Sequence, residues 1–317
     1  MPRAVRCFEG VPTIVDVDAP PPTDEHVRVR VRVVSAGICG SDLHLASWNL
    51  RSTLGHEFAG LLDDGRPVAV EPVDACGECD ACRADDYHLC VRGVRALIGV
   101  GRDGGMADQC NVPVTSIAPL PRALDPRDAC LAEPLAVAVH GTRRGDVQPT
   151  QRVAIIGGGT IGQCALVAAT ARGAQVDVAA RHDRQREVAQ RLGARSLEPT
   201  DGYDVVIEAA GTGDALADAI NRCKPGGAVV LLATYWDGHI DLPAMETTLR
   251  EIRLVPASLY NRANGIRDFD VAVDLLSQNP EITRAIITHR FPLDAVAEAF
   301  DTARDRQAGA IKVVLEP

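Results

Sequence analysis

A short glycine-rich stretch in the second half of the chain constrains its fold most strongly. Residues 157–162 read Gly-Gly-Gly-Thr-Ile-Gly and fit the spacing G-x-G-x-x-G. They lie between an apolar run (153–158) typical of a buried strand and a small-residue run (161–173) typical of a helix. In such a turn glycines allow a tight bend and let the backbone approach a pyrophosphate at the helix N-terminus. The segment therefore predicts a dinucleotide-binding turn with these contacts: Gly157, Gly159, Thr160, Ile161 and Gly162.

This turn opens a region in which apolar strands and helices alternate. Further strands are expected at 175–180, 204–211, 227–234 and 252–260, with a helix at 184–194. Such a rhythm predicts a parallel sheet with right-handed crossovers, that is, a doubly wound α/β domain of the Rossmann type. The last of these strands is predicted at the sheet edge. The alternative for the glycines is an ordinary turn that holds no ligand.

The end of the second strand of this region bears on the choice between NAD and NADP. A carboxylate at that position would accept a hydrogen bond from the ribose 2′-hydroxyl of NAD. Here Ala180 stands at the position and is followed by Arg181 and His182, and an arginine suits a 2′-phosphate. We therefore expect all three residues to contact the cofactor and NADP(H) to be preferred to NAD(H). In the alternative interpretation, Arg181 and His182 only begin a solvated helix.

The first half of the chain has a different pattern. Residues 27–35 alternate apolar and basic residues, which is typical of a strand with one buried face, and similar short strands recur to about residue 120. Proline and glycine interrupt them throughout, so this region predicts an irregular, mostly β domain. The polar, turn-rich segment 145–151 is a natural boundary, and two helical patterns and a strand follow residue 266. We therefore divide the chain into residues 1–147, 148–265 and 266–317.

Four cysteines lie close together in the first of these regions. Cys76, Cys79, Cys82 and Cys90 have the spacing C-x2-C-x2-C-x7-C. Four thiolates at such short spacing suit a tetrahedral zinc ion. Because a closed shell of four cysteines leaves no position for a substrate, this zinc would be structural.

A second group of possible metal ligands lies upstream of these cysteines. Cys39, His56 and Glu57 offer a thiolate, an imidazole and a carboxylate, which make a plausible zinc site with an open fourth position. Taken singly, Cys39 could also be a small buried hydrophobe and His56 a core histidine.

Composition excludes several classes of partner. The formal net charge is −10, from 33 basic and 43 acidic residues, which argues against a nucleic-acid or anionic-membrane surface. No apolar stretch reaches the length needed to span a bilayer, and the N-terminus lacks the pattern of a signal peptide. We therefore expect a cytoplasmic protein, in which ten cysteines indicate metal or catalytic roles rather than disulfides.

Together these segments resemble the zinc-dependent medium-chain dehydrogenase/reductase superfamily, which includes alcohol, polyol and threonine dehydrogenases. The matching pieces follow the family's order: GICGSDLH (37–44), GHEFAG (55–60), the cysteine lobe, AEPLAVAVHG (132–141), the glycine turn and IKVVL (311–315). The resemblance implies a GroES-like catalytic domain, a Rossmann domain, and a return of residues 266–317 to the catalytic domain. It also implies two zinc ions per chain.

The resemblance further implies the ligands of the catalytic zinc. Cys39 and His56 match two of them, and either Glu57 or Glu133 matches a further one; the sequence does not decide between the two glutamates. Asp42 would hold the other ring nitrogen of His56.

Roles for three more residues follow from the same resemblance. Ser41 and His44 match the family's proton relay, and Lys312 matches a basic residue near the cofactor pyrophosphate. For the first two, the alternatives are a helix N-cap and a surface histidine. The segment LLDDGRPVAV (61–70) replaces a longer hairpin of the family, which leaves the substrate pocket unspecified.

The function implied is hydride transfer between an alcohol, polyol or amino alcohol, or the matching ketone or aldehyde, and NADP(H). The family's quaternary structure implies a homodimer or homotetramer. Two alternatives stay open at this point: a medium-chain reductase of activated C=C or C=N bonds, and a non-catalytic nucleotide-sensing zinc protein.

Overall fold

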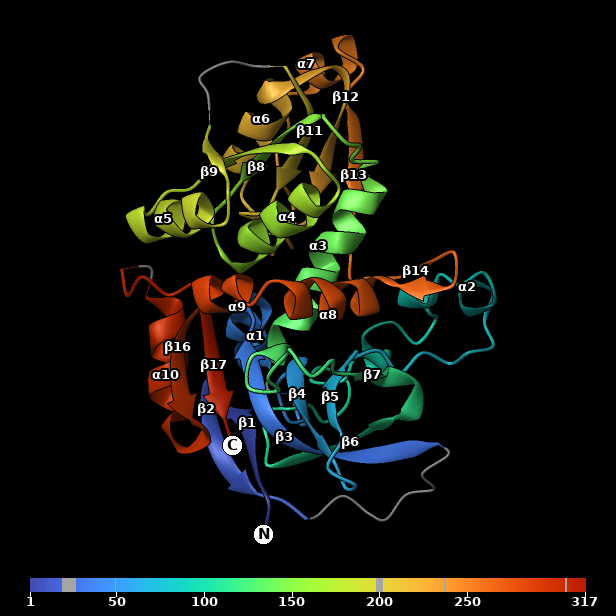
Figure 1. Cartoon of the computed structure of the whole chain (residues 1–317), viewed down its shortest axis with the longest axis vertical. Helices are drawn as coiled ribbons and strands as arrows, with labels where there is room; N and C mark the ends of the chain where they lie inside the picture. The colour runs from blue at the N-terminus through green and yellow to red at the C-terminus, as the bar shows by residue number, and fades with distance from the viewer. Residues whose placement is uncertain (19–26, 49, 198–201, 237, 306) are drawn as a thin grey trace. The chain divides into compact units, whose positions relative to one another are not determined.

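The computed structural model describes residues 1–18, 27–48, 50–197, 202–236, 238–305 and 307–317 (Figure 1). The chain divides into two compact units: the first comprises Met1–Glu133 and Asn261–Pro317, and the second comprises Pro134–Tyr260. Each division falls several residues before the boundary expected from the sequence. At the first division this is because helix α3 (Ala132–Arg144), which ends just before the turn-rich segment, belongs largely to the second unit.

The first unit contains a seven-stranded, mixed sheet, as expected for a GroES-like domain. Six strands follow the order β16-β17-β3-β4-β5-β7, and β6 pairs with β3. Their bounds are β3 (Arg28–Ile38), β4 (Glu57–Leu62), β5 (Pro67–Val70), β6 (Gln109–Pro113), β7 (Ile117–Pro119), β16 (Ile287–Pro292) and β17 (Lys312–Glu316). Two hairpins accompany the sheet: β1 (Arg3–Phe8) with β2 (Val11–Asp16), and β14 (Arg262–Ala263) with β15 (Ile266–Arg267). Its helices are α1 (Gly40–Leu45), α2 (Asp80–Arg83), α8 (Asp268–Gln278), α9 (Glu281–Ile286) and α10 (Val296–Arg304).

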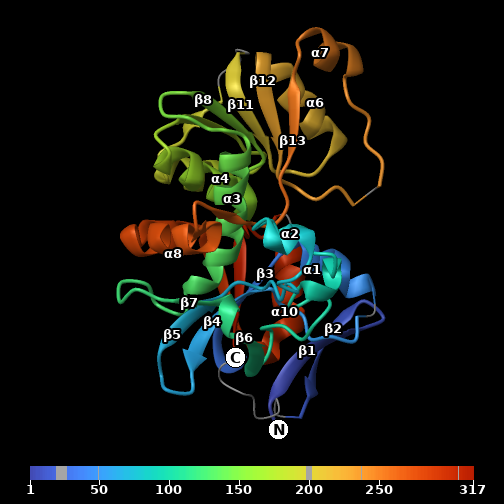
Figure 2. The same cartoon turned by 90° about the vertical axis from the view of Figure 1, so that its right-hand side faces the viewer.

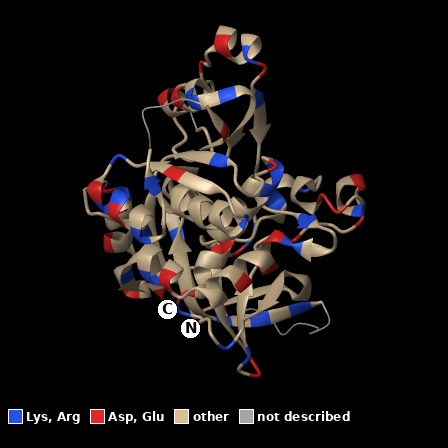
Figure 3. Ribbon diagram, turned by 45° about the horizontal axis from the view of Figure 1, so that its top comes forward, with Lys and Arg blue, Asp and Glu red and all other residues tan. Residues whose placement is uncertain are grey.

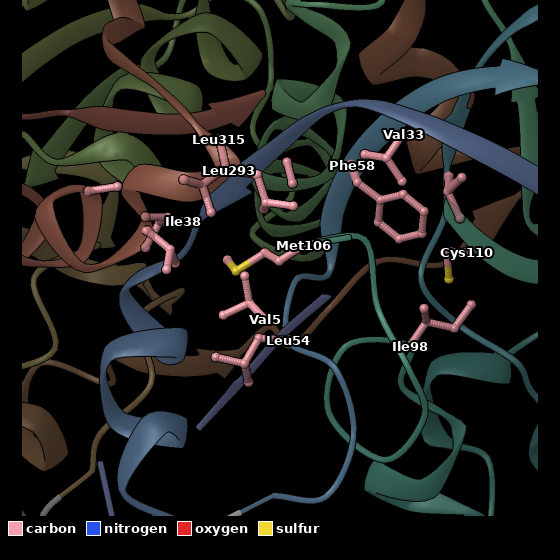
Figure 4. Close-up of a cluster of buried hydrophobic side chains, with 14 of the residues drawn as sticks. Val5, Val33, Ile38, Leu54, Phe58, Ile98, Met106, Cys110, Leu293 and Leu315 are labelled. Atoms are coloured by element: carbon pink, nitrogen blue, oxygen red, sulfur yellow. The ribbon is translucent and has the colours of Figure 1, made fainter. Parts of the chain in front are cut away.

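Strand β3 shows how the alternating sequence produces a sheet with one buried face. Arg30 and Arg32 are exposed, whereas Val31 and Val33 are buried. Burying each valine stabilises the fold by about 1.5–3 kcal/mol relative to leaving it exposed. Figure 4 shows the core that Val33 joins, which also contains Leu54, Phe58, Ile98 and Met106.

Residues 287–316 contribute two strands to this sheet. Strand β17 pairs antiparallel with β3, with Val314 opposite Gly37, and β16 pairs parallel with β17. The final strand therefore lies directly beside the end of β3, which leads into Cys39.

The second unit is a six-stranded parallel sheet of order β10-β9-β8-β11-β12-β13. Strands β8, β11, β12 and β13 of this sheet are labelled in Figure 2. Its strands are β8 (Arg152–Ile156), β9 (Gln175–Ala179), β10 (Arg195–Ser196), β11 (Tyr203–Glu208), β12 (Cys223–Leu231) and β13 (Arg253–Pro256). Its helices, besides most of α3, are α4 (Thr160–Ala171), α5 (Asp183–Arg191), α6 (Gly213–Arg222) and α7 (Ala244–Leu249). The strand order reverses between β8 and β11, which is the switch point at which doubly wound sheets bind dinucleotides. The prediction that the last strand lies at the edge is confirmed.

Acidic and basic residues are interspersed along the described part of the chain (Figure 3). Among the described residues, no helix combines the length and apolar character that a membrane span needs.

Candidate active site and zinc sites

The four cysteines of the lobe converge on one point. Their sulfur atoms all lie within 4.8 Å of one another. Backbone N–H groups point at the sulfurs: Cys79 donates to Cys76 Sγ and Cys76 donates to Cys90 Sγ, both at 3.3 Å. The N–H groups of Val91 and Cys82 lower the pKa of Cys79 to about 6, which favours the thiolate. The arrangement fits a tetrahedral zinc site with four thiolate ligands.

Polar contacts tie this lobe to the chain where it re-enters the first unit. The Tyr87 hydroxyl donates to Glu71, and Arg267 donates to the other oxygen of Glu71 at 2.9 Å. Asn261, the first residue of the returning segment, donates to Asp86 at 2.8 Å. Sequence reasoning missed these anchors because partners so far apart in the chain carry no local signal.

The second group of ligands also converges. Donor atoms of Cys39, His56 and Glu57 lie within 4.8 Å of one another. Cys39 follows β3 and precedes α1, while Glu57 opens β4 and pairs with Gly37 of β3. Ser41 Oγ lies 3.3 Å from His56 Nε2, so the hydroxyl of the expected relay stands at the metal-binding face of the imidazole.

Asp42 is hydrogen-bonded to one of these ligands and lies beside a second. Its buried carboxylate accepts a hydrogen bond from the Cys39 N–H at 2.9 Å, and its other oxygen lies 3.5 Å from His56 Nδ1. Burial lowers the pKa of His56, but Asp42 and the Cys39 thiolate outweigh it and raise the pKa well above its ordinary value. Surroundings that favour positive charge suit a zinc dication, and contact at Nδ1 leaves Nε2 for the metal.

The backbone beneath His56 is packed without room for side chains. Gly55 has φ +100°, and a Cβ there would lie 2.6 Å from Met106 N. A Cβ at Gly99 would lie 2.5 Å from the carbonyl carbon of Gly55. This close packing of two backbone segments fixes the position of His56, and sequence reasoning missed the contribution of Gly99.

Lys312 forms a buried ion pair with Glu57. Its ammonium lies 2.6 and 2.8 Å from the two carboxylate oxygens and donates to Ile38 O at 3.0 Å, and both side chains are at most 2% exposed. Burial lowers the pKa of Lys312, but the Glu57 carboxylate outweighs this and raises it. Lys312 was expected near the cofactor pyrophosphate, yet these three acceptors match its three donors. Its contact with the cofactor therefore stays a prediction.

Two other predicted residues lie in the same unit. Glu133, in the first turn of α3, is buried; burial and the Glu57 carboxylate raise its pKa to about 7. It is not among the three ligands that cluster within 4.8 Å in the described part of the chain. His44 lies on α1, three residues after Ser41, and is exposed. The roles expected for Glu133 and His44 stay predictions.

The glycine turn has the shape that a pyrophosphate needs. Gly157 has φ +115°, and a Cβ there would lie 2.9 Å from the carbonyl carbon of Ala209. A Cβ at Gly162 would clash with Gly157 O, so a glycine at this position lets helix α4 start close to the turn that follows β8. Gly159, the N-cap of α4, faces open space. The turn therefore leaves room for a phosphate at the helix N-terminus.

The two carboxylates near the end of β9 are already engaged. Asp177 is fully buried and accepts hydrogen bonds from Tyr203 and Arg195, both at 2.8 Å. Asp183, at the start of α5, pairs with Arg186.

Two zinc-ligand clusters, a GroES-like unit and a Rossmann sheet define a zinc-dependent, nicotinamide-linked dehydrogenase. Comparisons with known proteins agree. The family model "Glucose dehydrogenase C-terminus" matches residues 129–316, and "Alcohol dehydrogenase GroES-like domain" matches residues 25–122. The chain therefore belongs to the zinc-containing medium-chain dehydrogenase/reductase family.

Individual relatives cover nearly the whole chain. It is 31% identical to L-galactonate-5-dehydrogenase of Escherichia coli (strain K12) over 90% of this chain and 89% of that protein. A structure from Sinorhizobium meliloti 1021, described as a zinc-binding dehydrogenase bound to NADP, superposes with a TM-score of 0.87 at 29% identity, covering 100% of this chain and 99% of the other. An Escherichia coli CFT073 structure, described as a short chain alcohol dehydrogenase complexed with NADH, gives a TM-score of 0.88 at 27% identity with the same coverage. The protein is an NAD(P)-dependent zinc dehydrogenase that acts on CH–OH groups.

Proposed function

We propose that this enzyme transfers a hydride between a secondary hydroxyl group of a polyol or sugar acid and NADP(H). The observation that carries the proposal is the convergence of Cys39, His56 and Glu57 within 4.8 Å, with Ser41 beside them. The similarity to an L-galactonate dehydrogenase supports a polyhydroxylated substrate. Amino alcohols stay the second substrate class that we propose to test.

Residues of the first unit have different roles in the proposed reaction. When bound, the zinc ion supplies Lewis acidity and the nicotinamide supplies or accepts the hydride. Cys39 and His56 hold the metal, with Glu57 or Glu133 as a further ligand. Ser41 accepts the substrate proton, and the exposed His44 passes it to solvent.

Asp42 and Lys312 act on the ligands rather than on the substrate. Asp42 fixes the ring of His56 through Nδ1, and Lys312 neutralises Glu57. A site with these carboxylates and one thiolate suits a cation that polarises the hydroxyl group of an alcohol. For this reason we favour alcohols over the activated C=C or C=N bonds that other medium-chain reductases use.

The preference for NADP(H) rests on the charges at the end of β9. Ala180 offers no carboxylate to a ribose 2′-hydroxyl, and Asp177 and Asp183 are paired within the protein. Two arginines mark this strand end: Arg181 follows Ala180 in the chain, and the Arg186 guanidinium donates to Ala180 O at 2.8 Å. A 2′-phosphate would meet positive charge here.

Dissociation constants for NADPH and NADH, measured by fluorescence, test this preference. We expect NADPH to bind more tightly, and the double substitution Ala180→Asp with Arg181→Ala to reverse the order. Arg184→Ala is the matched control, because Arg184 is an exposed α5 arginine paired with Glu187. Tighter binding of NADH by the unaltered protein would overturn the assignment.

Reduction of NADP+ and NAD+ at alkaline pH with a panel of sugar acids, polyols, amino alcohols and secondary alcohols tests the substrate class. We expect turnover with polyhydroxylated compounds in protein that holds two zinc ions per chain. Turnover confined to reduction of activated double bonds would refute the proposal.

We also propose a homo-oligomer and a cytoplasmic location. Strand β13 lies at the sheet edge and is only partly buried, which suits pairing with a second copy. The thiols of both zinc sites need reducing conditions. Sedimentation analysis distinguishes a monomer, which would contradict the first proposal, from a dimer or a tetramer.

A further inference from the structure

A buried carboxylate lies at the carboxyl end of the central strand β11. Glu208 is fully buried, and its Oε1 accepts hydrogen bonds from the N–H groups of Ala210 and Gly211 at 2.7 and 2.8 Å. Its Oε2 accepts a hydrogen bond from the Tyr235 hydroxyl at 2.6 Å. Three donors around one acceptor-only group account for its stability in the interior.

These hydrogen bonds join the turn after β11 to the segment after β12, and packing adds the turn after β8. The turn after β8 touches the turn after β11, because Gly157 packs against Ala209. The turn after β11 touches the segment after β12, because a Cβ at Gly211 would lie 3.0 Å from Thr234 O. Tyr235 belongs to that last segment. Glu208 therefore holds together the segments that follow β11 and β12, at the edge of the sheet where a dinucleotide would bind.

The position of Tyr235 along this edge identifies which half of the cofactor it meets. A dinucleotide crosses the switch point with its pyrophosphate at the first turn and its adenosine ribose at the end of β9. The nicotinamide half must then extend to the opposite side, over the ends of β11 and β12. Tyr235 follows β12, and its half-buried side chain is held there by Glu208.

We propose that Tyr235, fixed by Glu208, positions the nicotinamide half of the cofactor. A buried carboxylate is costly unless it is fully paired, and apolar packing could close these turns at lower cost. Its presence at the ligand-binding edge is explained if the orientation of Tyr235 matters for binding. The inference rests on the proposed cofactor role of the glycine turn.

The substitution Tyr235→Phe tests it, because it removes the hydroxyl and keeps the ring. Two ligands are titrated: NADPH, and adenosine 2′,5′-bisphosphate, which lacks the nicotinamide half. We expect the dissociation constant of NADPH to rise about fivefold or more, as for a lost hydrogen bond to a charged group. The dissociation constant of adenosine 2′,5′-bisphosphate should stay within about twofold of its value for the unaltered protein. The emission maximum of bound NADPH should shift.

Tyr203→Phe is a matched control. The Tyr203 hydroxyl also donates to a buried carboxylate, Asp177, but it stands at the amino end of the same strand. We expect Tyr203→Phe to lower thermal stability. The ratio between the dissociation constants of NADPH and adenosine 2′,5′-bisphosphate should not change in this variant. Equal weakening of both ligands in Tyr235→Phe, or no change in NADPH binding, would overturn the inference. If the unaltered protein binds neither ligand, the proposed cofactor turn is itself refuted.

Discussion

Replacing Lys312 by methionine should destabilise the first unit strongly. Methionine keeps most of the volume of the side chain and removes the charge that faces Glu57. Because Glu57 is 1% exposed, its carboxylate would remain buried without the lysine charge that contacts both of its oxygens. Removing one partner of a buried ion pair costs about 3–5 kcal/mol.

The size of the effect can be expressed as a melting temperature. For a unit of roughly 150–250 residues, 1 kcal/mol corresponds to about 2–4 °C. The substitution should therefore lower the melting temperature of the first unit by about 6–20 °C. A second substitution, Glu57→Gln, should recover part of the loss in the double variant, because it removes the charge left unpaired.

The chain offers a matched control, since Lys224 is its only other lysine. Lys224 pairs with Asp204, but its side chain is 47% exposed. Exposed pairs of this kind contribute about 0–1 kcal/mol, so Lys224→Met should change little. Differential scanning calorimetry of the unaltered protein and the three variants at saturating zinc compares them directly. If Lys312→Met costs no more than Lys224→Met, the buried ion pair does not stabilise the unit as argued.

Three further substitutions test the two zinc sites and the turn. Cys39→Ser should abolish turnover and leave NADP(H) binding within a few fold; near-normal turnover would contradict a catalytic role for that thiolate. Cys79→Ser should reduce the zinc content by one ion per chain, measured by atomic absorption, and open the cysteine lobe to proteases; an unchanged zinc content would exclude it as a ligand. Gly162→Ala should prevent dinucleotide binding, because the new methyl group clashes with the carbonyl of Gly157; a bound cofactor in calorimetric titration would show that the turn can relax.

Local spacing predicted the parts of the molecule that depend on near neighbours. The four lobe cysteines lie within fifteen residues, so their convergence follows from short loops. The glycine turn depends only on the strand and helix that flank it. In both places one short segment sets the geometry, and the sequence was sufficient.

Contacts between distant segments could not be predicted in this way. Lys312 and Glu57 are 255 residues apart, and only the pairing of β17 with β3 brings them together. The same holds for the packing of Gly99 against Gly55 and for the hydrogen bond from Asn261 to Asp86 in the cysteine lobe. Their residue types are common and their partners are set by topology, so no local pattern marks them.

The discontinuity of the first unit has a consequence for how the protein is made. A ribosome completes Cys39, His56 and Glu57 long before it reaches β17. The second unit, contained in Pro134–Tyr260, has all its strands available earlier and can fold while the last segment is still being added. Until β17 arrives, Glu57 has no lysine beside it and β3 lacks one of its neighbours. The surroundings of Glu57 are therefore completed only once β17 has been synthesised, and removing β17 should leave a folded second unit attached to an unfinished first unit.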